Sequence, residues 1–128
     1  MGQTSGRTPA WLIEGIALYV SGDDRVAEAA GRVLSGRAPT LAGLSRPGAI
    51  GRLGGDGQSA AYAHSSAAAF YIAERFGRKR CFALYDAFND ASLGGSAGAA
   101  LADRAVRRTL GLSLEALERD LRRWIVAP

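Results

Sequence analysis

Apolar residues recur at helical spacing along most of the chain, and segments that alternate in the manner of β-strands are almost absent. The spacing predicts helices over about residues 9–21, 23–36, 59–77, 78–90, 99–111 and 113–126. We therefore expect an all-α fold over residues 8–128, a single compact bundle of about five or six helices with one long irregular loop.

Two segments lie outside this helical pattern. Residues 37–57 contain two prolines and six glycines, which predicts an ordered loop with one short helical turn at most. Leucines and an isoleucine within the loop are expected to hold it against the core, namely Leu41, Leu44, Ile50 and Leu53. Residues 1–7, MGQTSGR, are small and polar, and we expect them to be disordered or to remain from expression.

The first and last helices carry capping signals. Thr8 precedes Pro9, and proline suits the first helical position because its missing N–H would have no partner there. Ser113 precedes the last apolar stripe in the same way. Both signals predict where these helices begin.

Composition and charge exclude several classes of protein. The 128 residues suffice for one domain, and the net charge of +4 is spread among mixed acidic and basic residues, so we expect no nucleic-acid partner. A single Cys81 excludes an internal disulfide and a cysteine-built zinc site, and it is expected to be a small buried apolar residue. The chain shows neither a signal peptide nor an apolar run long enough to span a membrane, and its cellular location is not indicated.

A glutamate stands in the middle of the most apolar predicted helix. The stretch TPAWLIEGIALYV, residues 8–20, surrounds Glu14 with apolar side chains on every side of the helix. A helix that is apolar all round is normally buried, and a buried carboxylate needs a partner, a proton or a metal ion. We therefore expect Glu14 to be buried and to have a specific role.

The same stretch resembles a segment of zinc peptidases. PAWLIEGIALYV is similar to the Pro-x-Trp-Leu-x-Glu-Gly-x-Ala-x-Tyr segment of gluzincin metallopeptidases, most closely the peptidase MA-like families. The segments YAHSSAAAFYIAERFGRKRCFALYDAF and TLGLSLEALERDLRRWI also resemble helices that follow in these families. The likeness extends over residues 8–126, and its first block is the most specific.

The resemblance implies a role for several residues. In these families an upstream helix carries an HExxH motif, whose histidines bind zinc, and Glu14 matches the third zinc ligand. Tyr62 matches a tyrosine that donates a hydrogen bond to the tetrahedral oxyanion in aminopeptidase-N-like relatives. Gly15 is expected to leave room for the zinc-bearing helix. Zinc with three protein ligands and an open position activates a water for hydrolysis of a peptide or protein substrate.

The chain departs from the family pattern because it contains no HExxH, and its single histidine is His64. We expect a C-terminal subdomain of a longer protein, whose upstream HExxH-bearing part is its partner. The alternative is a non-catalytic protein-interaction module on a degenerate peptidase scaffold. In either case, this chain alone should bind no zinc and hydrolyse no peptide. The first helix should expose apolar surface near Trp11 and Glu14, which offers a route to a homodimer.

Simpler roles are open for each candidate residue. Glu14 would pair with one of the fifteen arginines, and Tyr62 would be a core tyrosine with its hydroxyl at the rim. His64 would be exposed or hydrogen-bonded. Trp11 and Tyr19 are expected to belong to the core.

Overall fold

The computed structural model describes residues 6–127, which contain six α-helices and one 3-10 turn joined by loops. No strand occurs in that part, so the predicted all-α fold is confirmed. None of the described helices combines the length and the apolar character needed to cross a membrane. The elements are α1 (Ala10–Ser21), α2 (Val26–Leu34), α3 (Gly55–Phe76), α4 (Arg78–Ala87), the turn η1 (Ala91–Leu93), α5 (Ala99–Leu110) and α6 (Leu114–Val126).

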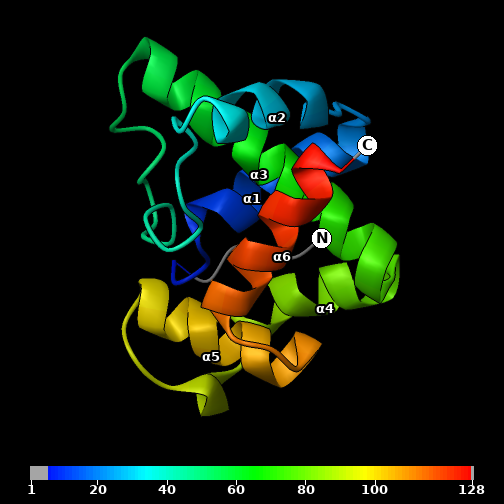
Figure 1. The fold of residues 1–128 in the computed structure, drawn as a ribbon. Helices are drawn as coiled ribbons and strands as arrows, with labels where there is room; N and C mark the ends of the chain where they lie inside the picture. The colour runs from blue at the N-terminus through cyan, green and yellow to red at the C-terminus, as the bar shows by residue number, and fades with distance from the viewer. Residues whose placement is uncertain (1–5, 128) are drawn as a thin grey trace.

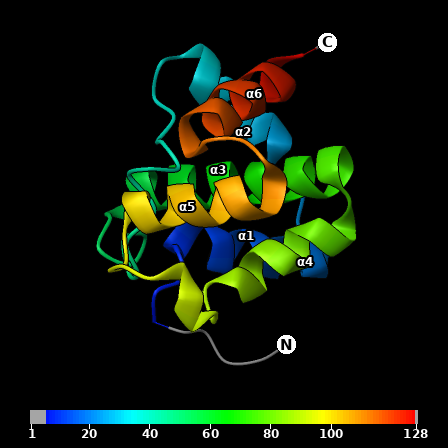
Figure 2. The same ribbon diagram turned by 90° about the horizontal axis from the view of Figure 1, so that it is seen from below.

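The longest helix, α3, runs through the middle of the molecule and packs against four others. Figures 1 and 2 show α2 and α6 on one side of α3, and α1 and α4 on the other. Helix α5 lies farther out and joins the two sides, because it packs against both α4 and α6. The bundle therefore has α3 as its central rod.

Helix α3 begins at Gly55, four residues before the start that its apolar pattern predicts. The first turn has no apolar stripe to reveal it, but it carries Asp56, whose negative charge favours a helix N-terminus. Asp56 also forms an ion pair with Arg32 of α2, with 3.1 Å between Oδ1 and Nη2. The long loop is therefore shorter at this end than predicted.

Helix α1 approaches α3 so closely that only glycine fits at the contact. A Cβ atom on Gly15 would lie 2.5 Å from the carbonyl oxygen of Ser65 and 3.3 Å from the Cβ of Ala69. Small side chains in the middle of α3 allow this approach. The expectation that Gly15 leaves room for a separate zinc-bearing helix is wrong, because α3 of this chain fills that space.

The loop between α2 and α3, residues 35–54, is held against the core by its apolar side chains. Leu41, Leu44 and Ile50 are buried, as predicted, and they belong to the main apolar cluster. Leu53 was expected among them but is 39% exposed, because it lies at the end of the loop, just before α3 begins.

Hydrogen bonds from α1 anchor the same loop. The backbone N–H of Trp11 donates to the carbonyl of Leu44 at 3.2 Å, and the indole Nε1 of Trp11 donates to Ser45 Oγ at 3.2 Å. Ser45 Oγ in turn donates to the carbonyl of Leu41 at 2.7 Å. Trp11 is 1% exposed and thus belongs to the core, as expected.

The predicted caps are correct for one helix and wrong for the other. Ser113 Oγ accepts a hydrogen bond from the backbone N–H of Ala116 at 3.0 Å, which caps α6. In α1, the residue in the N-cap position is Pro9, and the helix begins one residue later than predicted. Thr8 lies one residue before this position, so it is not the N-cap residue of α1.

Two features near α4 complete the fold. The guanidinium of Arg7 donates to the carbonyl of Phe88 at 3.1 Å and to that of Asp90 at 3.0 Å, so this residue belongs to the fold. Residues 1–5 of the segment 1–7 lie outside the described residues.

Cys81 is fully buried, with Sγ 3.9 Å from the carbonyl oxygen of Ala69, and burial raises the pKa of its thiol to about 11.

Substitution of Gly15 tests the close contact between α1 and α3. Gly15→Ala should lower the free energy of unfolding by about 1–3 kcal/mol, because the new methyl group must push two backbones apart. Gly31→Ala is the matched control, since nothing lies within 4 Å of its added Cβ. In the interior of α2, that change should stabilise the protein by about 0.5–1 kcal/mol. Urea unfolding of both variants measures the contrast, and equal effects of the two substitutions would contradict this packing.

Candidate functional site

Glu14 lies at the border between the packed and the exposed sides of α1. It is half-buried, so the expectation of full burial is wrong. Its neighbour Gly15 faces α3, and successive residues of a helix point about 100° apart, which turns Glu14 away from the contact. Its carboxylate has no hydrogen bond or ion pair with any described residue, so the alternative of an arginine partner is also wrong there.

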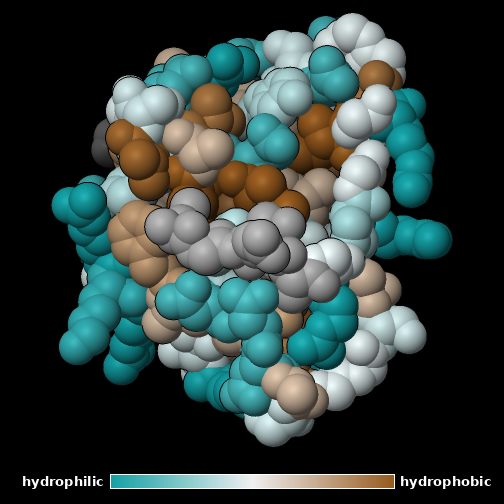
Figure 3. Space-filling view, turned by 180° about the vertical axis from the view of Figure 1, so that it is seen from behind, coloured by the Kyte–Doolittle hydropathy of each residue, from teal (hydrophilic) through white to brown (hydrophobic). Residues whose placement is uncertain are grey.

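The outer side of α1 is apolar and lacks a covering helix in the described part of the chain. Ile13, Ala17 and Val20 follow one another along it, with Ile13 half-buried, Ala17 exposed and Val20 62% exposed. Helix α1 lies at the back of the molecule in Figure 1, and Figure 3 shows apolar surface gathered on that face. Apolar surface was expected beside both Trp11 and Glu14, but the buried Trp11 takes no part in it.

Tyr62, the second candidate residue, lies near the start of α3. It is half-buried and packs against the apolar core, which agrees with the simpler role of a tyrosine at the rim. Its hydroxyl has no hydrogen bond with any described residue. Glu14 and Tyr62 lie on two helices that pack together, but no hydrogen bond or ring contact between the described residues joins them.

A buried histidine–carboxylate pair stands apart from both candidates. His64 is 1% exposed, and its Nε2 donates to Glu118 Oε2 at 2.9 Å. Arg122 Nε donates to the same oxygen at 2.9 Å, and the backbone N–H of Leu41 donates to Oε1. The guanidinium of Arg122 also donates to the carbonyl of Pro39 at 2.7 Å. This network ties the long loop to α3 and α6, so His64 is hydrogen-bonded rather than exposed.

Two opposing influences decide the pKa of Glu118. Burial is the largest single one and raises the pKa, because it disfavours the charged carboxylate. The hydrogen bond and charge of His64, the N–H of Leu41 and the hydrogen bond from Arg122 together outweigh burial. The pKa of Glu118 therefore lies below its usual value of 4.5, and the carboxylate is charged at neutral pH.

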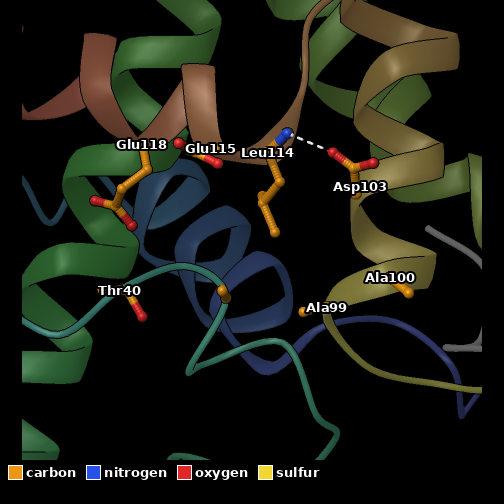
Figure 4. A pocket seen from close by; sticks show the side chains of 8 residues that line it. Thr40, Ala99, Ala100, Asp103, Leu114, Glu115 and Glu118 are labelled. Carbon is orange, nitrogen blue, oxygen red and sulfur yellow. Dashed lines mark hydrogen bonds between the residues drawn. The ribbon is translucent and has the colours of Figure 1, made fainter.

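A pocket of about 440 Å³ lies between the long loop and the starts of α5 and α6 (Figure 4). It is lined by Thr40, Ala42, Ala99, Ala100, Asp103, Leu114, Glu115 and Glu118. Two of its three carboxylates already have structural partners. Asp103 accepts hydrogen bonds from the N–H of Leu114 and from Arg107, each at 2.8 Å, and Glu118 belongs to the histidine network. Neither candidate catalytic residue lines this pocket.

The described residues include no group of three or more histidine, cysteine, aspartate or glutamate side chains that could hold a metal ion. Glu14 fits a zinc site as a single ligand, since its carboxylate is without a partner and reaches the surface. A site of the kind that the resemblance implies would take its histidines from another segment.

Comparisons with models of protein families, with curated proteins and with solved structures found no match to this chain.

The network around Glu118 is the structural feature that sequence reasoning missed. Glu118 lies among alternating acidic and basic residues in α6, which resemble a solvated helix face. One signal pointed to it. His64 is the single histidine and follows a tyrosine and an alanine in a helix of small side chains, where a buried imidazole needs a polar partner.

The depressed pKa of Glu118 predicts a specific pH dependence of stability. A carboxyl whose pKa is lower in the folded than in the unfolded state stabilises the fold fully above the unfolded value, and this stabilisation is lost as the pH falls through the folded value. Glu118→Gln should therefore destabilise the protein at pH 7, by about 1–3 kcal/mol. The difference in the free energy of unfolding between this variant and the wild type should become smaller below pH 4.5, the pKa of the unfolded state.

Urea unfolding of the wild type and of Glu118→Gln, measured from neutral to acidic pH, gives this difference in stability. Glu115→Gln is the control, because Glu115 is an exposed glutamate on the same helix without a partner among the described residues. Its difference from the wild type should stay small at every pH. A gap for Glu118→Gln that does not change with pH would contradict the charged network.

Proposed function

We propose that this chain is the C-terminal helical subdomain of a zinc-dependent peptidase-like protein. In that protein, Glu14 is the third zinc ligand, and α1 forms part of the wall of the cleft in which a peptide bond is hydrolysed. Two histidines of an upstream HExxH motif complete the ligand set. The chain alone has no peptidase activity.

The observation that carries this proposal is that the carboxylate of Glu14 has no partner among the described residues. Its carboxylate interrupts an otherwise apolar helix, yet no described residue pairs with it. Glu118, which is also only partly exposed, accepts hydrogen bonds from an arginine and a backbone N–H, whereas Glu14 accepts none from a described residue. The apolar outer side of α1 around it offers a surface against which a zinc-bearing helix would pack.

The proposed chemistry divides between the zinc ion and the protein. Bound zinc would supply a water acidic enough to attack a carbonyl near neutral pH. Glu14 contributes a negative oxygen ligand on a helix whose rotation is fixed by the contact at Gly15. Tyr62 remains the proposed oxyanion donor, and its hydroxyl makes no hydrogen bond with a described residue that would compete for that role.

A second candidate is a non-catalytic interaction module on the same scaffold. The exposed apolar residues of α1, Ala17 and Val20, favour it, because such a surface also suits a protein partner or a second copy of the chain. The gene sequence upstream of residue 1 distinguishes the two candidates. An HExxH motif supports the peptidase, whereas a longer protein without one excludes the catalytic role.

Glu14→Gln tests the ligand role in two proteins. In this chain, the substitution should change the free energy of unfolding by less than about 0.5 kcal/mol, because the carboxylate has no partner to lose. In the longer protein, it should weaken zinc affinity by at least the roughly 10- to 100-fold that outer-shell residues contribute, with a matching loss of hydrolysis.

Metal analysis, zinc titration and cleavage of a fluorogenic peptide measure these effects. Glu115→Gln, an exposed glutamate on α6, should leave zinc content and hydrolysis unchanged. Full zinc content in the Glu14→Gln protein would overturn the ligand assignment.

A further inference from the structure

A second pocket, about 270 Å³, opens where α1, α3 and α6 meet. It is lined by Tyr19, Asp24, Phe70, Ala73, Glu74 and Trp124. Three of these side chains are aromatic, two are acidic and none is basic, although the chain as a whole has a net charge of +4. The charged side chains of this lining are therefore all acidic, whereas the chain as a whole is basic.

The aromatic rings are held in place by contacts with one another and with α3. Tyr19 and Phe70 meet edge to face, with 5.0 Å between ring centroids and 72° between ring planes. Trp124 packs on Tyr71 at 5.4 Å. The face of an aromatic ring carries negative electrostatic potential, so a wall of rings attracts a cation without the hydrogen bonds that an anion or a neutral polar group requires.

Both carboxylates are oriented by hydrogen bonds that use only one of their oxygens. Asp24 Oδ1 accepts from the N–H of Val26 at 2.9 Å, and Glu74 Oε2 accepts from Trp124 Nε1 at 2.6 Å. The second oxygen of each has no hydrogen bond with a described residue. Two negative charges thus border the aromatic wall, and neither is neutralised by an ion pair within the described chain.

We propose that this pocket binds an organic ammonium cation, with its alkyl groups against the rings of Tyr19, Phe70 and Trp124 and its charge beside Asp24 and Glu74. An anion would meet two like charges here. A metal ion would find too few oxygen ligands, because half of the lining is aromatic. This inference does not depend on the proposed peptidase function, since neither Glu14 nor zinc takes part in it.

Choline is the probe. Its control is dimethylbutanol, an uncharged compound of the same shape in which a carbon atom replaces the quaternary nitrogen. Each is added to the full chain labelled with nitrogen-15, and the indole N–H signals of the two tryptophans are followed by NMR. Trp124 lines the pocket, whereas Trp11 is buried elsewhere with its indole on Ser45, so it serves as an internal reference. Choline should shift the Trp124 signal in a saturable way at millimolar concentration and leave that of Trp11 in place. Dimethylbutanol should bind at least about tenfold more weakly.

The double variant Asp24→Asn, Glu74→Gln removes both charges and keeps an acceptor oxygen for Val26 and for Trp124. It should bind choline at least about tenfold more weakly than the wild type. A second double variant, Asp86→Asn, Glu115→Gln, changes the net charge equally at exposed residues outside the pocket and should bind choline normally. Thermal unfolding followed by circular dichroism checks that both variants fold.

Three results would each overturn the proposal. The first is an absence of saturable shifts at Trp124 with up to about 50 mM choline. The second is equal affinity for choline and dimethylbutanol, which would show an apolar pocket without selectivity for charge. The third is an equal loss of affinity in the two double variants, which would show a general effect of net charge.

Discussion

The close contact between α1 and α3 at Gly15 is the constraint on which both proposed sites depend. Because a hydrogen atom is all that separates the two backbones there, α1 cannot turn about its own axis without a clash. The contact thus decides which residues of α1 face outward, and Glu14 comes to lie at the edge. Tyr19 lies four residues after Gly15 on the same side of α1, so the contact also directs Tyr19 toward Phe70 of α3.

A second constraint comes from the carboxylate of Glu118, which accepts a hydrogen bond from the backbone of the long loop where no helix or strand supplies one. A loop without strands or helices leaves backbone groups that need partners, and here a side chain from α6 accepts the N–H of Leu41 while Arg122 reaches the carbonyl of Pro39. The loop is therefore ordered by polar side chains as well as by its buried leucines. His64 adds a partner from the central helix, so three parts of the chain far apart in sequence meet at one carboxylate.

Helical periodicity sufficed to predict the number and approximate bounds of the helices, because long amphipathic stripes record which side of each helix is buried. It failed for Glu14, since a helix that is apolar all round can still lie at the edge of a bundle when no described element covers it. The start of α3 escaped prediction because its first turn carries glycines and Asp56 instead of apolar residues. The partnership of His64 with Glu118 joins residues 54 positions apart, and no local pattern encodes such a distance. The role of Glu14 stays a prediction, since it concerns a partner beyond the described fold.

The burial of Cys81 between α3 and α4 makes the single thiol a natural reporter of local opening. A thiol-labelling reagent needs both physical access and a thiolate, and the closed bundle denies the first and disfavours the second. Modification therefore requires that α4 separate from α3, so its rate under native conditions is governed by how often this pair of helices parts. The labelling rate of Cys81 thus measures local opening of the bundle at its central helix.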